Sequence, residues 1–496
     1  MVRRVVHKNL ILTIVAVAQF MVVLDTSIVN VALPSIFKAL HFTSPANLQW
    51  VVTSYTIAFG GFLLLGGRAA DLYGRKRIFM TATSLFAIAS LVTGLSQNSL
   101  MIEITRAAQG LIAAFMSPAA LSIVLTTFRQ GKERAAALSV WGAVAAAGGA
   151  AGALFGGILT SYLDWRWNFF VNVPVGLFIA LMAYWYVPES KADLKHNKLD
   201  LPGAVTVTAG LMLLVYTFTK APSYGWGNHR TVELLAGSIC LLGIFILNEA
   251  RSRHPLMPLG FFKVGNVAAA NLTALPIIAS MFSMFFFVTL YVQQVLHYTP
   301  IKAGLSFLPI TFVIGGTAIA MQHIVAKIGY KKPLVMAPLL QGAGIYYLAH
   351  IPVYGHYWSN VFPGMVVIAA GMGLGFISMT IAATNGVAHE DSGLASGLLN
   401  TAQQVGGSLG LAILSGISAS GAARYFAEHP LHINAAQPAV TAHAGQLLAL
   451  QAEVHGFHNA LQVGACFSLT AAILAVTLIR EKRGEEIKAD GGVAAI

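Results

Sequence analysis

Residues 67–77 read Gly-Arg-Ala-Ala-Asp-Leu-Tyr-Gly-Arg-Lys-Arg and lie between two long apolar segments. Each flanking segment has about 20 residues, which is enough to cross a bilayer as a helix. A soluble protein has no reason to place a charged turn between two such helices. In a membrane protein the turn can tie two helices together on the inner side, and it can break and re-form when the protein changes shape. The segment therefore indicates a chain that crosses the membrane repeatedly.

The composition agrees with a membrane protein. The chain has 496 residues, of which 56% are hydrophobic and only 10% are charged, with a mean hydropathy of +0.71, whereas an ordinary globular chain has about 25% charged residues. Backbone groups inside lipid must bond within their own segment, so the apolar runs are expected to be helices. We predict an all-α integral membrane fold with about fourteen spans. They lie near residues 10–33, 48–66, 78–97, 100–126, 136–160, 167–188, 200–220, 231–250, 267–294, 303–326, 333–351, 359–383, 395–420 and 457–479.

The basic residues orient these spans. The chain has 30 lysines and arginines, and most of them fall in the loops on the same side as the N-terminus. The opposite loops hold only Lys38, Arg166, Lys220, Arg230, Lys302 and Arg424. This asymmetry predicts that both termini are cytoplasmic. It also accounts for the net charge of +12, which is therefore not a sign of nucleic-acid binding.

Several classes of site are excluded by what the sequence lacks. It contains no Gly-x-x-x-x-Gly-Lys-Ser/Thr loop for a nucleotide and no catalytic constellation, so we predict neither an enzyme nor a nucleotide-driven pump. Cys240 and Cys466 both lie in spans, which excludes a disulfide framework or a cysteine metal site. The histidines after the thirteenth span fit no familiar zinc spacing. We expect no cofactor other than an ion gradient.

A faint internal repeat divides the chain. The segment Ala326–Lys332 aligns with Ala70–Arg77 when Gly329 is placed on Gly74, and the same offset places the glycine-rich fifth span on the thirteenth. Transporters that rock two halves around a central site contain parallel repeats of this kind. We predict a six-helix bundle over residues 1–190, two inserted helices over 191–262, a second six-helix bundle over 263–480 and a tail over 481–496.

Three charged residues in the first half are candidates for moving protons. Asp25 lies inside an apolar span, where acids are costly and mark ion or proton pathways. Arg106 lies at a similar depth, about 9 Å from the outer face compared with about 13 Å for Asp25. Burial and a nearby arginine act in opposite directions on the pKa of a carboxyl group, so it can exchange protons near neutral pH. Glu103 lies one turn from Arg106 and is close enough to share it. A fixed structural salt bridge is the alternative reading.

The charged turn is a candidate inner gate. Asp71 can accept bonds from arginines and from a helix N-terminus. The fifth span begins near Arg134, on the same side of the membrane. We predict a charge cluster that closes the inner side, and the alternative is that the basic residues only set the topology. The gate residues are Gly67, Asp71, Gly74, Arg75, Lys76, Arg77 and Arg134.

The second half offers soft apolar side chains for a ligand. The ninth span contains Phe282, Phe286 and Tyr291 among methionines, and such side chains suit varied apolar or cationic ligands. Asn400 and Gln404, in the thirteenth span, can donate hydrogen bonds to a substrate. The phenylalanine and methionine side chains could equally face lipid.

The order of these motifs resembles the major facilitator superfamily, and within it the fourteen-spanner drug:proton antiporter branch (EmrB/QacA-like). The resemblance spans nearly the whole chain. It rests on the loop motif of residues 67–77, the first-span segment Leu24–Pro34, the fourth-span segment Arg106–Gly110, the fifth-span segment Gly148–Gly157, residues 165–176 and the thirteenth-span segment Gly393–Gly410. It adds Asn30 and Gln109 to the candidate substrate-binding residues.

The fifth-span motif departs from the pattern of the branch. Its glycines Gly148, Gly152, Gly156 and Gly157 are present, but Ala153 stands where a proline is usual. The missing proline removes a helix kink, while the glycines still allow close packing.

The resemblance implies two six-helix bundles with two inserted helices in the cell membrane, acting as a monomer. It implies proton-coupled export of small amphipathic or cationic molecules by alternating access, with protons and the lipid bilayer as the other partners and no nucleic acid or nucleotide. Two alternatives remain: a lipid or lipid-precursor transporter on the same fold, and a non-transporting receptor or assembly partner.

Overall fold

The computed structural model describes residues 8–128, 132–191, 199–252, 254–387, 391–430 and 438–481, and these ranges form helices and their connections. The first part of the chain contains α1 (Lys8–Ala39), α2 (Pro45–Leu48), α3 (Trp50–Tyr73), α4 (Arg75–Gly94), α5 (Ser99–Thr127), α6 (Lys132–Tyr162), α7 (Trp167–Phe170) and α8 (Asn172–Tyr186). A pair of helices follows, α9 (Leu201–Tyr224) and α10 (His229–Arg251). The last part contains η1 (Leu259–Lys263), α11 (Val267–Leu290), η2 (Tyr291–Val295), α12 (Pro300–Ile328), α13 (Lys331–Leu348), η3 (Tyr357–Val361), α14 (Phe362–Thr384), α15 (Ser392–Glu428) and α16 (Pro438–Leu478).

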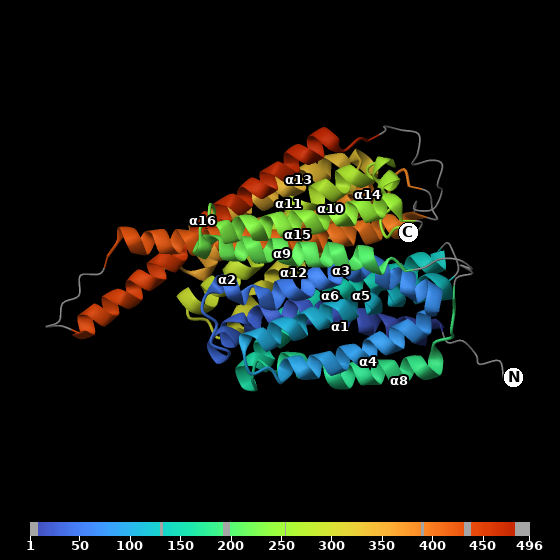
Figure 1. Ribbon diagram of the computed structural model, residues 1–496, viewed down its shortest axis with the longest axis horizontal. Coiled ribbons are helices and arrows are strands. Elements are labelled where there is room, and N and C mark those ends of the chain that lie inside the picture. The colour runs from blue at the N-terminus through green and yellow to red at the C-terminus, as the bar shows by residue number, and fades with distance from the viewer. Residues whose placement is uncertain are drawn as a thin grey trace.

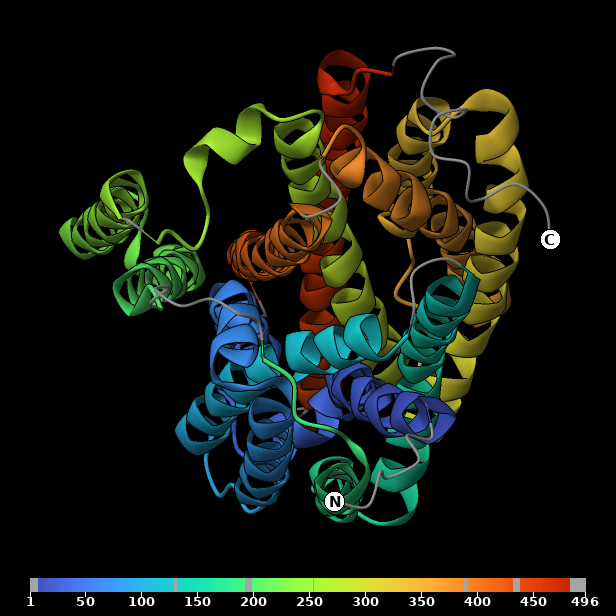
Figure 2. The ribbon, with the colours of Figure 1, turned by 90° about the vertical axis from the view of Figure 1, so that its right-hand side faces the viewer.

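The long helices run side by side in two groups. Helices α1 to α8 form one group and α11 to α16 the other, as the colours separate in Figure 1. Figure 2 looks along the helices and shows α9 and α10 as a separate pair outside the two groups. Of these two, α9 is the inner member, because it packs against α3 of the first group and α15 of the second. We call the end that carries the Gly74 turn the inner end and the opposite end the outer end.

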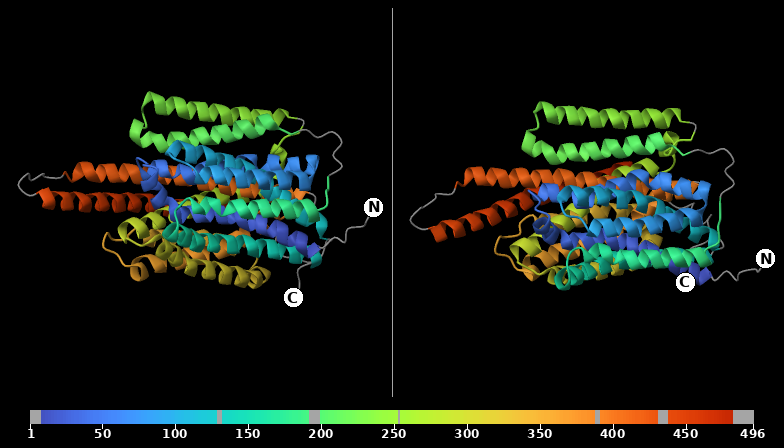
Figure 3. Two further views of the ribbon diagram at one scale, coloured as in Figure 1. Left: turned by 90° about the horizontal axis from the view of Figure 1, so that it is seen from below. Right: turned by 60° about the horizontal axis from the view of Figure 1, so that its bottom comes forward.

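Helices α15 and α16 are longer than a bilayer requires. They contain 37 and 41 residues, or about 55 and 60 Å at 1.5 Å per residue, against about 30 Å of hydrocarbon. Figure 3 shows them projecting beyond the other helices at the outer end. The predicted last span, 457–479, is therefore only the second half of a continuous helix that begins at Pro438.

Twelve helices within the described ranges are long and apolar enough to cross a membrane. The predicted number of fourteen is thus not established by length and composition. Helices α6 and α13 lie outside the set of twelve. The latter has only 18 residues and starts with two lysines, which lowers its hydropathy, whereas the former is an apolar helix of 31 residues whose side chains the structure describes only in part.

Candidate functional site

Asp25 and Arg106 form an ion pair in the middle of the first helix group. Asp25 comes from α1 and Arg106 from α5, and Arg106 Nη1 lies 2.5 Å from Asp25 Oδ2. Their side chains are 0% and 1% exposed. The pairing predicted from matching depth is therefore present, and water does not reach it in this conformation. A buried ion pair needs further hydrogen bonds to offset the cost of removing both charges from water.

Side-chain amides and hydroxyls supply those bonds to the carboxylate. Asn172 of α8 donates to Asp25 Oδ1 (2.9 Å), and Gln109 donates to the same oxygen at 3.5 Å. Both amides also donate to Ser90 Oγ of α4, at 3.3 and 2.6 Å. The carboxylate on α1 is thereby linked to three other helices, directly to α5 and α8 and through the amides to α4. Sequence reasoning did not assign Ser90 or Asn172 to the site, although both are polar residues inside apolar helices.

The guanidinium of Arg106 is held on its other sides by α3. Its Nε donates to Val51 O at 3.0 Å, and its Cζ lies 4.3 Å from the ring centroid of Tyr55. Its Nη1 also donates to Gln109 Oε1 at 3.2 Å. These contacts of the guanidinium do not involve Asp25. Chemically, the site offers one carboxylate that can bind a proton, at the cost of leaving the buried guanidinium without its counter-charge.

Glu103 does not share Arg106. Among the described residues no hydrogen bond joins the two, and Glu103 instead lines a cavity of about 390 Å³ at the outer end, where Lys220 of α9 is its electrostatic neighbour. The prediction that Glu103 belongs to the Arg106 pair is therefore wrong in geometry. One helical turn separates the two residues, but the side chain of Arg106 points into the helix group and that of Glu103 lies at its edge.

At the inner end, the carboxylate of Asp71 pairs with Arg75 across the Gly74 turn. Arg75 Nη2 lies 2.7 Å from Asp71 Oδ1, and Ser122 of α5 donates to the same oxygen at 3.3 Å. The charge cluster thus joins α3, α4 and α5 within the first group. Arg134, predicted to join it, donates instead to Phe128 O at 3.2 Å, and none of the described contacts links it to Asp71.

The basic triplet is organised by a residue that sequence reasoning missed. The carboxylate of Glu189, just after α8, accepts the backbone N–H groups of Lys76 and Arg77, both at 3.1 Å. It therefore caps the N-terminus of α4, where a negative charge is favourable. Lys76 Nζ donates to Tyr184 O at 2.7 Å. Gly67, also predicted for the gate, faces Pro118 of α5.

Gly74 is required by both conformation and space. Its φ is +111°, and a Cβ atom there would lie 2.7 Å from Glu189 Oε1. We expect Gly74→Ala to lower the free energy of unfolding by about 1–3 kcal/mol through backbone strain and displacement of the cap. Reversible unfolding in mild detergent measures this. Gly227→Ala is the control, because no atom lies within 4 Å of its Cβ position. Equal stability of the two variants would contradict the assignment.

The second group repeats the glycine turn that the sequence alignment predicted, and the structure shows that this turn is capped as well. Gly329, between α12 and α13, also has a positive φ, +78°. Glu481 follows α16 as Glu189 follows α8, and its Oε1 accepts the N–H of Tyr330 at 2.8 Å. A Cβ on Gly329 would meet the Glu481 carboxylate. The two groups therefore share both a glycine with positive φ and a glutamate that caps the helix after it.

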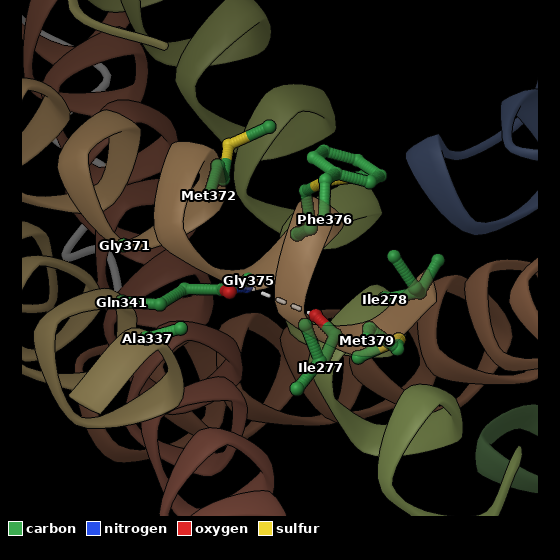
Figure 4. A pocket seen from close by; sticks show the side chains of 10 residues that line it. Ile277, Ile278, Ala337, Gln341, Gly371, Met372, Gly375, Phe376 and Met379 are labelled. Atoms are coloured by element: carbon green, nitrogen blue, oxygen red, sulfur yellow. Dashed lines mark hydrogen bonds between the residues drawn. The ribbon is translucent and has the colours of Figure 1, made fainter. Parts of the chain in front are cut away.

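The second group also contains an uncharged counterpart of the Asp25 site. Ser280 of α11 stands at the same offset from Asp25 as Gly329 from Gly74. Gln341 of α13 donates to Ser280 Oγ (2.8 Å) and to Ile277 O (2.9 Å), and Ser468 of α16 donates to Ser280 Oγ at 2.9 Å. Figure 4 shows Gln341 reaching Ile277 beside a cavity of about 10 Å³. That is about the space of one water molecule, so this site is closed to a substrate.

The fifth-span glycines let α6 lie directly on α1 and α12. Gly148, Gly152 and Gly156 recur every four residues and meet Val23, Ser27 and Ile28 of α1. Gly157 faces the first turn of α12, where a Cβ would lie 2.7 Å from Pro300 O. The prediction that these glycines permit close packing is therefore met in the structure. The stripe joins the first helix group to the second.

At Gly152 an added methyl group would meet both the side chain of Ser27 and the backbone of Ile28. A Cβ there would lie 2.8 Å from Ser27 Cβ and 3.0 Å from Ile28 N. We expect Gly152→Ala to push α6 from α1 and to cost about 1–3 kcal/mol of unfolding free energy. Gly149→Ala on the same helix is the matched control, since no atom lies within 4 Å of its Cβ position. Denaturant unfolding distinguishes them; a stable Gly152→Ala protein would show that the helices separate easily.

The candidate substrate residues do not gather around one cavity. Gln109 belongs to the Asp25 network, Phe286 is 1% exposed and packs edge-on against Phe287, and Tyr291 donates to Pro352 O at 2.7 Å. These three are therefore structural in this conformation. Asn400 is exposed. The others are partly exposed: Asn30, Phe282 and Gln404. None of the seven lines the outer cavity beside Glu103 or the small cavity beside Gln341.

A family match covers most of both helix groups and the buried ion pair. Residues 15–411 match the family description Major Facilitator Superfamily. The chain belongs to the major facilitator superfamily. It is accordingly a membrane transporter and not an enzyme, and the charged Gly74 turn is the loop motif from which the resemblance was inferred.

Relatives within the superfamily are drug-resistance and export proteins. The chain is 37% identical to the puromycin resistance protein pur8 of Streptomyces alboniger, covering 94% of this chain and 90% of the relative. It is 38% identical to the cephamycin export protein CmcT of Amycolatopsis lactamdurans, with 85% and 87% covered. The multidrug resistance protein Stp of Mycobacterium tuberculosis (strain CDC 1551 / Oshkosh) is 31% identical, with 84% and 77% covered.

Solved structures of other transporters have the same fold. A bacterial homologue of the human lysosomal transporter Spinster, in an inward-facing and occupied conformation, superposes with a TM-score of 0.69 at 14% identity, covering 95% of this chain and 96% of that one. The xylose transporter XylE from E. coli, in an inward-open conformation, gives 0.61 at 15% identity, with 97% and 98% covered. At such low identity these likenesses concern the fold alone.

Proposed function

We propose that the protein is a proton-coupled antiporter that exports amphipathic, cationic small molecules. The observation that carries the proposal is the fully buried Asp25–Arg106 pair. Burying two charges away from water costs free energy, and charged residues inside a membrane usually serve an ion or proton pathway. Proton uptake and release by Asp25 would account for the pair. The roles of the relatives in antibiotic resistance and export support a small-molecule substrate.

The residues around Asp25 suggest how the cycle runs. When Asp25 is charged, it holds Arg106 and the amides of Gln109 and Asn172, and through them α1, α5 and α8. Protonation weakens this link and lets the first helix group change shape. A cationic substrate that competes with the proton for the carboxylate then moves in the opposite direction. In this scheme the neutral Ser280 site of the second group stays bonded throughout.

We further propose the arrangement in the membrane. Helix α6 packs along α1 and α12, and α13 packs between α14 and α16, so both would cross the membrane with their neighbours and make fourteen spans of the EmrB/QacA type. The bias of the basic residues would place both termini in the cytoplasm and the protein in the cell membrane. The contacts between the two helix groups lie within one chain, which is compatible with a functional monomer. The charged Gly74 turn, with Asp71 and Arg75, would then form the inner gate.

Transport in liposomes tests the proposal. Purified protein is reconstituted, a pH gradient is imposed, and accumulation of a fluorescent cationic dye such as ethidium is followed with and without a protonophore. We expect uphill movement that the protonophore abolishes. Dye movement that ignores the gradient would contradict proton coupling. Flipping of a fluorescent lipid without dye transport would favour a lipid transporter, and neither activity would favour a receptor.

A further inference from the structure

A cavity of about 390 Å³ opens at the outer end where α9 meets the first helix group. Its volume lies in the range of small-molecule sites. It is lined by His41, Phe42, Thr43, Asn47, Trp50, Ser99, Leu100, Glu103, Tyr216 and Lys220. None of these residues belongs to the Asp25 network. The cavity is therefore a separate place in the protein, built in part from the inserted helix pair.

Buried hydrogen bonds hold two of the cavity's helices together. Gln49 of the α2–α3 junction is fully buried and donates to Thr219 Oγ1 of α9 at 2.7 Å, and its Oε1 accepts a bond from Thr53 at 2.7 Å. These bonds tie α9 to α3 beside the residues that line the cavity. Trp50 and Tyr216 lie one and three residues further inward along the two helices, and their ring centroids are 6.3 Å apart. The aromatic wall is thus supported by buried polar contacts.

Two opposite charges line the cavity without forming an ion pair. No nitrogen–oxygen distance of 4.0 Å or less joins Glu103 to Lys220 among the described residues, although the two interact electrostatically. The ammonium of Lys220 donates to Asn47 Oδ1 at 3.2 Å and lies 6.0 Å from the Tyr216 ring centroid. The carboxylate of Glu103 accepts no hydrogen bond from the described residues. Both charges are partly exposed, so each can take a further partner.

We propose that this cavity binds a zwitterionic molecule with a flat apolar body. Glu103 takes the ammonium group of the ligand, Lys220 takes its anionic group, and the rings of Trp50 and Tyr216 contact the body. A cation alone would be repelled by Lys220 and an anion alone by Glu103, so the two separated charges select a ligand that bears both. This inference does not depend on proton coupling, because it concerns binding at equilibrium.

The same chemistry could come from a soluble amphipath or from the headgroup of a zwitterionic lipid. The cavity borders the outer ends of α5 and α9, so a ligand could enter from either phase. The inserted helix pair then has a role in ligand binding, because α9 supplies Tyr216 and Lys220. Removal of the charge on α9 would change binding without touching either six-helix group.

Three probes with one ring and different charges test the proposal. Tryptophan is a zwitterion, tryptamine a cation and indole-3-propionate an anion. Their binding to the full chain in nanodiscs is measured by saturation-transfer NMR without a pH gradient. We expect tryptophan to bind about threefold to tenfold more tightly than either other probe. Equal binding of the three probes, or no binding of tryptophan, would overturn the proposal.

Variants assign the charges. Glu103→Gln should weaken tryptophan and tryptamine and spare indole-3-propionate, whereas Lys220→Met should weaken tryptophan and indole-3-propionate and spare tryptamine. Lys302→Met is the matched control, since this outer lysine lies over a different ring, Tyr298, at 3.8 Å. Unchanged probe affinities in both variants would overturn the proposal, with melting temperatures used to verify folding.

Two further measurements separate the cavity from the Asp25 site and identify the source of the ligand. Asp25→Asn should leave tryptophan binding unchanged, and loss of binding there would place the probe at the Asp25 site and overturn the assignment. Weaker tryptophan binding in phosphatidylcholine nanodiscs than in phosphatidylglycerol nanodiscs would show that a zwitterionic lipid headgroup occupies the cavity. Equal binding in the two would show that the ligand comes from solution. Either result supports the recognition chemistry.

Discussion

Replacing Arg106 with leucine should lower the free energy of unfolding by about 3–5 kcal/mol, because Asp25 would remain as a buried charge without its partner. Leucine removes the 2.5 Å bond to Asp25, the bond to Val51 O and the contact with the Tyr55 ring. The two amides that still reach Asp25 cannot replace a full positive charge. Unfolding in a denaturing detergent, followed by helical circular dichroism, measures the loss.

Two controls identify the cause of that loss. The double variant Asp25→Asn with Arg106→Leu should recover part of the stability, since no isolated charge remains in the core. Arg166→Leu, which breaks the partly exposed pair with Asp164 on an outer loop, should have a much smaller effect. If the double variant were less stable than Arg106→Leu alone, the unpaired carboxylate would not be the source of the destabilisation.

Replacing Asp25 with asparagine should abolish uphill export while leaving the protein able to exchange substrate. Asparagine has the size of aspartate and can accept a bond from Arg106, but it cannot bind and release a proton. We expect at least about a tenfold fall in gradient-driven accumulation. Counterflow, in which unlabelled substrate on one side drives labelled substrate across, should persist because it needs no proton. Both assays use the same liposomes.

A second carboxylate, Asp164, serves as the control for Asp25→Asn. Asp164→Asn removes an outer, partly exposed acid and should leave both assays unchanged. Undiminished uphill transport by Asp25→Asn would remove Asp25 from the mechanism. Glu103 would then be the next carboxylate of the first helix group to test. Loss of both uphill transport and counterflow would indicate that the variant has lost substrate binding or its fold.

The two halves of the protein differ in charge at corresponding positions. At the corresponding place in the second half stand Ser280, Gln341 and Ser468, which can satisfy one another by hydrogen bonds but carry no charge. The sequence contains no aspartate or glutamate from residue 250 to residue 389. Helices α11 to α14 therefore offer no carboxylate that could take over proton binding.

Much of the fold and the central ion pair were predictable from sequence. Apolar runs of about 20 residues report helices across a bilayer because lipid forces the backbone to bond locally. An acid inside such a run needs a partner, because an unpaired charge in the membrane costs free energy. Arg106 is the basic residue within a span at a matching depth, so the pair with Asp25 could be predicted. The repeat was visible because Gly74 and Gly329 meet the same demand for a positive φ.

The contacts that complete the site depended on tertiary structure. Asn172 and Ser90 are uncharged polar residues whose role appears only when α8 and α4 bring them close to one carboxylate. Glu189 reaches the Gly74 turn from 115 positions further along the chain. Glu103 shows the opposite case: helical spacing predicted a contact with Arg106, but its side chain lines the outer cavity. Hydropathy and spacing report what each helix needs along its own length. Which side chains meet is decided by the rotation and packing of helices against each other, and one-dimensional spacing does not contain that information.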